Sequence, residues 1–148
     1  FPGGSVTGSV SGLGGADVFT VTASSGVGTM TLSGGADNDT FTVNGGVTLT
    51  ASSVSGDGND VTLTLTNGTA VVTGVFVGGT GTDTLIGDDD YDVTGANRGD
   101  ASQLDTLATN GTFDWDGVEN LAGPGGVDAF EVNGGWVTGS GSGVGNSM

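Results

Sequence analysis

The sequence predicts an all-β protein, a parallel β-solenoid (β-helix) of about six coils with about 22 residues in each. Three observations lead to this prediction. Glycine accounts for 33 of the 148 residues and only 34% are hydrophobic, while Thr and Val are abundant, a composition that disfavours long helices. Short alternating strands are separated by corners of Gly, Asn and Asp, as in residues 34–50. Apolar residues also recur at a fixed interval.

The interval is set by the apolar residue that follows each corner aspartate. These residues are Phe19, Phe41, Leu63, Leu85, Leu107 and Phe130, which lie 22 residues apart at four steps and 23 at the last. A second apolar group comprises Val27, Val47, Leu49, Val71, Tyr91, Val93, Phe113, Trp115 and Trp136. A third is traced by Leu32, Val54, Val77, Leu121 and Val144. We therefore expect up to three short strands in each coil.

Stacked coils give these strands a partner that a short strand cannot provide alone. If each coil returns to the same place about 4.8 Å higher, every strand pairs in parallel with its copy in the next coil. Apolar side chains at equal positions then form inward columns. Outward positions are largely Thr and Ser, as at Thr20, Thr42 and Thr64, which is the alternation expected of a strand with one wet face.

The 148 residues are expected to form one domain. Residues 1–16 form a partial first coil, and an extra residue between Asp60 and Leu63 predicts a bulge in the third. The stretch from Gly87 to Gln103 is polar and irregular, so a protruding loop is expected near residues 95–103. Residues 139–148 are either a flexible tail or a segment between subunits.

Neither end carries a recognisable cap, and uncapped coils expose unpaired strand edges. Flanking repeats or copies of the chain itself are therefore the expected partners. The first residue is Phe1 rather than Met, which favours a processed product or an excerpt of a longer chain.

Charge and composition exclude several functions. The chain has 17 acidic residues, Arg98 as its only base and a net charge of −16, so nucleic acid and anionic membranes are poor partners, whereas divalent cations are favoured. No apolar run approaches the roughly 20 residues that span a bilayer, so no membrane insertion is expected. His, Cys and Lys are absent, which removes the usual catalytic triads and Schiff-base chemistry. A paired-carboxylate glycosidase remains formally possible, but the chain is not expected to be an enzyme.

The corners carry a resemblance to known repeats. Residues 78–86, reading GGTGTDTLI, match in full the calcium-binding nonapeptide of RTX proteins, and residues 34–41 match except that Asp37 replaces a glycine. Residues 12–19, 56–60 and 123–130 are degenerate versions. RTX rolls, however, carry two nonapeptides in a shorter turn. The run from Asp83 to Phe130 also resembles haemagglutinin- and adhesin-like β-helix repeats of large bacterial surface proteins, over about a third of the chain. This resemblance implies an extracellular or cell-surface location.

Stacking is expected to place one aspartate of each corner in a single column: Asp17, Asp39, Asp60, Asp83, Asp105 and Asp128. Unit charges about 5 Å apart repel by roughly 1 kcal/mol even in water. A hard cation such as Ca²⁺ would remove this cost, and glycine corners expose carbonyl oxygens that complete its shell. The expected ligands are Asp17, Asp37, Asp39, Asp60, Asp83 and Asp128. The alternative is that these carboxylates accept hydrogen bonds from corner N–H groups.

Three further features have a functional and a structural interpretation. The cluster at residues 88–92, four aspartates and a tyrosine, could bind a second cation, present a pair of carboxylates to carbohydrate, or form a solvated acidic corner. Trp115 and Trp136 could stack on sugars, although the core is favoured for at least one of them. The sequons at Asn38, Asn67 and Asn110 are candidates for glycosylation but also arise by chance in a chain rich in Thr and Asn.

Three functional hypotheses follow. The first is an extracellular structural or adhesive module, a segment or subunit of a surface fibre, filament or adhesin that Ca²⁺ stabilises. The second is an RTX-like module that folds with calcium and serves secretion or folding of an attached effector. The third and weakest is a β-helix that binds or cleaves polysaccharide.

Overall fold

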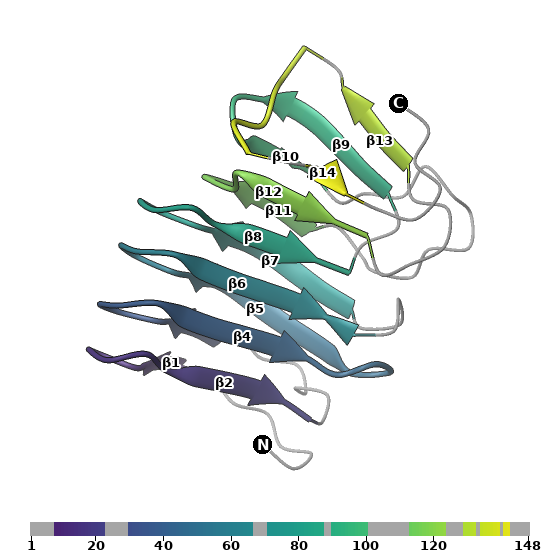
Figure 1. Ribbon diagram of the computed structural model, residues 1–148. Coiled ribbons are helices and arrows are strands. Elements are labelled where there is room, and N and C mark those ends of the chain that lie inside the picture. The colour runs from purple at the N-terminus through teal and green to yellow at the C-terminus, as the bar shows by residue number, and fades with distance from the viewer. Residues whose placement is uncertain are drawn as a thin grey trace.

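The protein is described here from a computed structural model, and the regular secondary structure of its described residues is almost entirely β-strand. The structure describes residues 8–22, 30–66, 71–87, 90–100, 113–123, 129–132, 134–139 and 141–142. Within these ranges the strands pair mostly in parallel and form two sheets (Figure 1). The prediction of an all-β chain with parallel strands is therefore confirmed.

The first sheet has six strands and is parallel throughout. From one edge to the other it contains β2 (Val18–Val21), β4 (Asp39–Val43), β6 (Val61–Leu65), β8 (Thr84–Ile86), β12 (Asn120–Ala122) and β14 (Gly141–Ser142). Up to β8 its strands alternate along the chain with strands of the second sheet, so each strand pairs with a partner one repeat away. β-branched and aromatic residues favour these extended segments, and glycine ends them.

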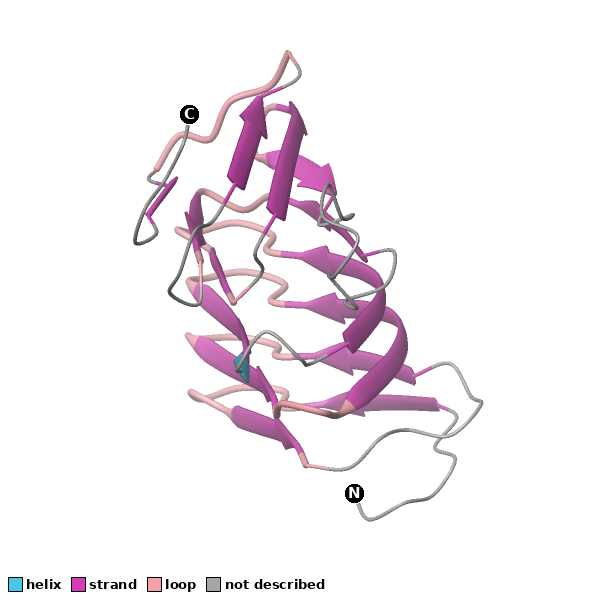
Figure 2. Cartoon of the chain, turned by 90° about the vertical axis from the view of Figure 1, so that its right-hand side faces the viewer, coloured by secondary structure: helices cyan, strands magenta, loops and turns pink. Residues whose placement is uncertain are grey.

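The second sheet has eight strands. In spatial order they are β1 (Gly8–Ser11), β3 (Met30–Ser33), β5 (Thr48–Ser55), β7 (Val71–Val77), β11 (Phe113–Asp116), β10 (Arg98–Asp100), β9 (Asp90–Gly95) and β13 (Ala129–Val132). The pairings of β10 with β9 and with β11 are antiparallel, and the others are parallel. Figure 2 shows the loops between the two sheets stacked in line along the molecule.

The core lies between the sheets and is built from columns of apolar side chains. In the six-stranded sheet Phe19 pairs with Phe41, Phe41 with Leu63, and Leu63 with Leu85, each 22 residues apart. The rings of Phe19 and Phe41 stack with centroids 4.7 Å apart. The second sheet contributes a column of buried residues in the same way: Leu32, Val54, Phe76 and Trp115. These four repeats confirm the predicted interval.

Beyond Leu85 the predicted columns are wrong. Leu121, not Leu107, pairs with Leu85, and it lies 36 residues later because β9 and β10 are inserted between these repeats. Phe130 pairs with Tyr91 in the eight-stranded sheet, and Leu107 lies outside the described residues. The third column is corrected too, because Phe76 rather than Val77 lies opposite Val54. Side chains alternate between the faces of a strand, so this shift of one residue turns Val77 away from the core.

Other predicted elements also need correction. The second and third apolar groups lie in single long strands, β5 and β7, whose pairing shifts register between Thr50 and Ser53, so the described repeats contain two strands each rather than three. The loop expected at residues 95–103 is instead a hairpin of β9 and β10 up to Asp100. The predictions for Val27, Val144 and residues 143–148 lie outside the described residues. No helix in the described part of the chain is long and apolar enough to cross a membrane.

Candidate metal centre at the aspartate corners

Four equivalent corners carry the chain from the eight-stranded sheet to the six-stranded sheet. They begin at Gly12, Gly34, Gly56 and Gly78, and each of these glycines donates its N–H to a carbonyl of the next repeat at 2.9–3.0 Å. Parallel bridges join Gly14 to Ala36, Ala36 to Gly58, and Gly58 to Thr80. The corners are therefore held in the same 22-residue register as the strands.

Carboxylates at the inner position of the corners bind the backbone of the preceding repeat. Oδ1 of Asp39 accepts a hydrogen bond from the N–H of Asp17 at 2.9 Å, and Oδ1 of Asp83 accepts one from the N–H of Val61 at 2.8 Å. Glu119, just before β12, does the same for the N–H of Asp83 at 2.8 Å. The alternative interpretation, that corner aspartates accept backbone hydrogen bonds, is confirmed at these positions.

The predicted place of Asp60 in this column is wrong. The strand pairing places Val61, not Asp60, opposite Asp39 and Asp83, so Val61 occupies the third place in the inner column. Asp60 lies one residue earlier, opposite residue 82 of the next repeat. Asp60 is exposed, and its Oδ1 accepts the N–H of Thr82 at 2.8 Å. The bulge expected between Asp60 and Leu63 is absent from β6, whose register with both neighbours is continuous. Packing of the apolar side chains keeps the repeat at 22 residues. The aspartate of this corner, Asp60, lies one residue before the inner position.

Two of the inner carboxylates, Asp39 and Asp83, are deeply buried. Asp39 is 2% exposed and Asp83 is fully buried, and among the described residues the Oδ2 atoms of Asp17, Asp39 and Asp83 have no hydrogen-bond partner. Burial raises the pKa of Asp83; the N–H of Val61 opposes this shift, while the nearby charges of Glu119 and Asp60 add to it. A buried carboxylate without a counter-charge destabilises the folded state unless it binds a proton or a cation.

The Oδ2 atoms of Asp17 and Asp83 lie where a side chain would be if Gly12 and Gly78 were any other residue. A Cβ on Gly12 would overlap both Oδ2 of Asp17 and the carbonyl oxygen of Gly34. A Cβ on Gly78 would likewise overlap Oδ2 of Asp83 and the carbonyl oxygen of Gly117. Each space is therefore lined by a carboxylate oxygen and a carbonyl oxygen, the donor set that a hard cation prefers and that a protonated carboxyl group can also bridge.

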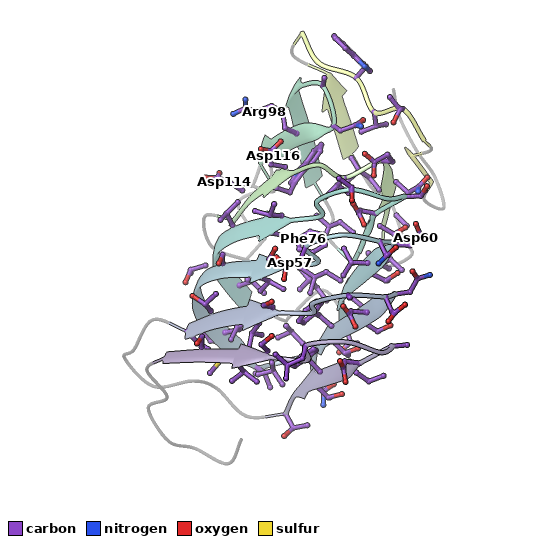
Figure 3. The ribbon with its side chains drawn as sticks, turned by 90° about the vertical axis from the view of Figure 1, so that its left-hand side faces the viewer. Asp57, Asp60, Phe76, Arg98, Asp114 and Asp116 are labelled. Carbon is purple, nitrogen blue, oxygen red and sulfur yellow. The ribbon has the colours of Figure 1, made fainter. Side chains whose placement is uncertain are left out.

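The outer acidic residues are engaged differently. Oδ2 of Asp37 accepts the N–H of Gly15 at 3.0 Å. Asp57 accepts hydrogen bonds from the hydroxyls of Ser33 and Ser55. Both bonds lower the pKa of its carboxyl group, and the bond from Ser33 has the larger effect. Figure 3 shows Asp57 and Asp60 at separate points of the third corner. Asp57 and Glu119 were not predicted from the sequence, although the 22-residue spacing of Ser33 and Ser55 was a signal for Asp57.

The inner column does not carry a carboxylate at every corner. The side chain of Val61 offers no oxygen, and the described residues contain no group of three or more His, Cys, Asp or Glu side chains placed to hold a metal. Beside Gly12 and Gly78 a carboxylate oxygen and a carbonyl oxygen lie close to one point, which is two of the six to eight oxygen ligands that Ca²⁺ takes. Asp128, Asp105, Asn67 and Asn110 lie outside the described residues.

Of the remaining candidates, Asn38 is exposed in its corner. Trp115 is 1% exposed and belongs to the core, as expected for at least one tryptophan, whereas Trp136 is 60% exposed. Residues 88 and 89 of the acidic run lie outside the described residues.

No family model matches the chain, and comparison with curated proteins and with solved structures also gives no match. The functional argument therefore rests on the geometry of this molecule.

Proposed function

We propose that the chain is a β-solenoid segment of an extracellular structural or adhesive assembly, such as a surface fibre, filament or adhesin. The observation that carries this proposal is the pairing of equivalent residues 22 apart through four successive repeats of the six-stranded sheet. Such a stack grows along one axis and leaves its terminal strands without partners on one side.

The two ends support the proposal. Among the described strands, β1 and β2 are terminal in their sheets at one end, and β13 and β14 are terminal at the other (Figure 1). Leu13 and Val18, near the first end, are 78% and 75% exposed. An edge strand flanked by exposed apolar side chains is a template for another strand. Flanking repeats or another copy of the chain would continue both sheets there, and head-to-tail contacts of this kind form open filaments.

Electron microscopy of the purified chain over a concentration series tests the self-assembling form of this proposal. We expect filaments of uniform width in which the wild-type chain stacks end to end. Lysine at both Leu13 and Val18 should shorten or abolish them. Lysine at Thr80, an exposed corner residue in the middle of the stack, is the matched control and should leave them intact. A wild-type chain that stays monomeric at every concentration contradicts self-assembly.

A calcium-folded module of the RTX kind is the second candidate, and the oxygen-lined spaces at the corners favour it. Asp17 with the carbonyl of Gly34, and Asp83 with the carbonyl of Gly117, would hold the ion. A bound Ca²⁺ would supply a counter-charge to the partly buried Asp17 and to the fully buried Asp83. Circular dichroism separates the two candidates, because the second predicts loss of the sheet signal in EGTA and its recovery on adding Ca²⁺.

A further inference from the structure

The outer face of the six-stranded sheet carries a regular array of β-branched side chains. Eight positions on β2, β4, β6 and β8 form two columns that run along the stack. One column is Val18, Thr40, Thr62 and Thr84, and the other is Thr20, Thr42, Thr64 and Ile86. We call these eight residues the threonine face, and Figure 1 looks onto the sheet from this side.

The spacing of the threonine face is uniform. Neighbouring members of a column lie one strand spacing apart, about 4.8 Å, and the two columns are separated by two residues, about 6.6 Å. No register shift occurs in the pairings of these four strands. β-Branched side chains have few χ1 rotamers, so hydroxyl and methyl groups are held in place before any ligand arrives. Little conformational entropy is therefore lost on binding.

The face also differs chemically from the rest of the molecule. None of its eight residues is charged, although the chain has a net charge of −16. All are at least partly exposed. The opposite sheet makes a useful contrast, because the equivalent outward column is irregular: Ser9, Thr31, Ser53, Val75 and Asp114. Its pairings also contain register shifts.

A rigid, uncharged and periodic array of hydroxyl and methyl groups matches a periodic ligand better than a single molecule. We propose that the threonine face binds the surface of ice. In hexagonal ice the oxygen atoms repeat at a distance close to one strand spacing, so waters bound to one repeat are in register with those bound to the next. The methyl groups disfavour a disordered hydration layer, and the hydroxyls anchor an ordered one.

The alternative occupant, a crystalline polysaccharide, fits less well. Faces that bind sugar rings usually present aromatic side chains for stacking, and none of the eight residues is aromatic. Trp115 is buried in the core, and Trp136 lies outside the six-stranded sheet. The ice proposal concerns a surface complete within one chain, so it does not depend on the fibre proposed above.

Three measurements on the purified chain test the proposal: thermal hysteresis, inhibition of ice recrystallisation, and partition into a growing ice hemisphere. We expect activity in all three for the wild type. Lysine at both Thr42 and Thr64 should abolish most of it, because it places charge and bulk in the centre of the face. The matched control is Thr31→Lys, on the outward face of the other sheet, which should retain wild-type activity.

A conservative variant guards against an unfolding artefact. Thr64→Val keeps the shape and the methyl group, and it should retain part of the activity with an unchanged circular dichroism spectrum. Absence of ice activity in the wild type overturns the proposal, as does equal loss in Thr31→Lys and in the double variant. Wild-type binding to crystalline cellulose or chitin without ice activity would assign the face to polysaccharide instead.

Discussion

Replacing Asp83 by Asn is expected to stabilise the protein in metal-free buffer near neutral pH. The side chain is fully buried, its Oδ1 accepts the N–H of Val61, and its Oδ2 has no hydrogen-bond partner among the described residues. The amide oxygen of Asn can keep the first bond. Its NH₂ group takes the place of Oδ2, on the side of the Gly117 carbonyl, to which it can donate.

The size of the effect follows from what the substitution removes. A buried polar atom without a partner costs about 1–3 kcal/mol, and more when it is charged. We therefore expect Asp83→Asn to raise the free energy of unfolding by about 1–3 kcal/mol near neutral pH. The wild type should behave differently with pH: because burial raises the pKa of Asp83 above its usual value of 3.8, this residue's contribution to stability falls as pH rises from 3.8 through the raised value. The variant lacks that component.

Urea unfolding followed by circular dichroism, repeated from about pH 4 to pH 8 with EGTA present, measures both effects. Asp37→Asn is the control, because Asp37 is an exposed carboxylate that also accepts a backbone N–H, and its change should stay within about 0.5 kcal/mol. Destabilisation of Asp83→Asn in EGTA would refute the argument from burial. Destabilisation seen only with Ca²⁺ present would instead locate a calcium ligand at Asp83.

Three further predictions concern the core, the outer corner and the gap in the column. Leu63→Ala should lower the free energy of unfolding by about 2–5 kcal/mol, against at most about 1 kcal/mol for its outward neighbour Thr62→Ala, as read from urea midpoints. The hydroxyls of Ser33 and Ser55 lower the pKa of Asp57, so the stabilising contribution of its carboxylate is present above the usual value of 3.8 and is lost as pH falls through the lowered value. Ser55→Ala removes one of these hydroxyls, so an NMR titration of this variant should show a higher pKa for Asp57 than in the wild type. Val61→Asp adds a buried carboxylate between Asp39 and Asp83, so it should destabilise the metal-free chain by about 1–3 kcal/mol or more. Titration calorimetry should find tighter Ca²⁺ binding by Val61→Asp than by wild type under the calcium hypothesis, and unchanged binding contradicts it.

The fold could be predicted where apolar side chains repeat without interruption. Phe19, Phe41, Leu63 and Leu85 pair as expected, because a slip of one residue would turn a whole strand's apolar side chains toward solvent. The fifth repeat could not be found by counting, since a hairpin with antiparallel pairing is inserted before Leu121. The 22-residue repeat contains no information on the length of this insertion. Counting in steps of 22 therefore gave wrong partners for the residues that follow it.

The candidate site was harder to predict, because polar residues at a corner are not fixed by packing. Asp60 comes one residue before the inner position, and Val61 fills that position instead. The bonds that Asp57 forms with Ser33 and Ser55 become visible only when the register of the sheets is known. Glu119 belongs to a corner of different sequence, from which its longer side chain still reaches the N–H of Asp83.

Val61 shows that the inner position of a corner does not require an acidic side chain. Val61 is 1% exposed and packs against Gly56 as Asp39 packs against Gly34, so an uncharged side chain of similar size satisfies the fold at this position. Charge is therefore not needed to close the corner. Burying a carboxylate at Asp39 and Asp83 carries a desolvation cost that valine avoids. Each carboxylate receives one N–H bond. At Asp83, where burial raises the pKa, a bound proton offsets the remaining cost, so the stability of the stack depends on pH through this residue.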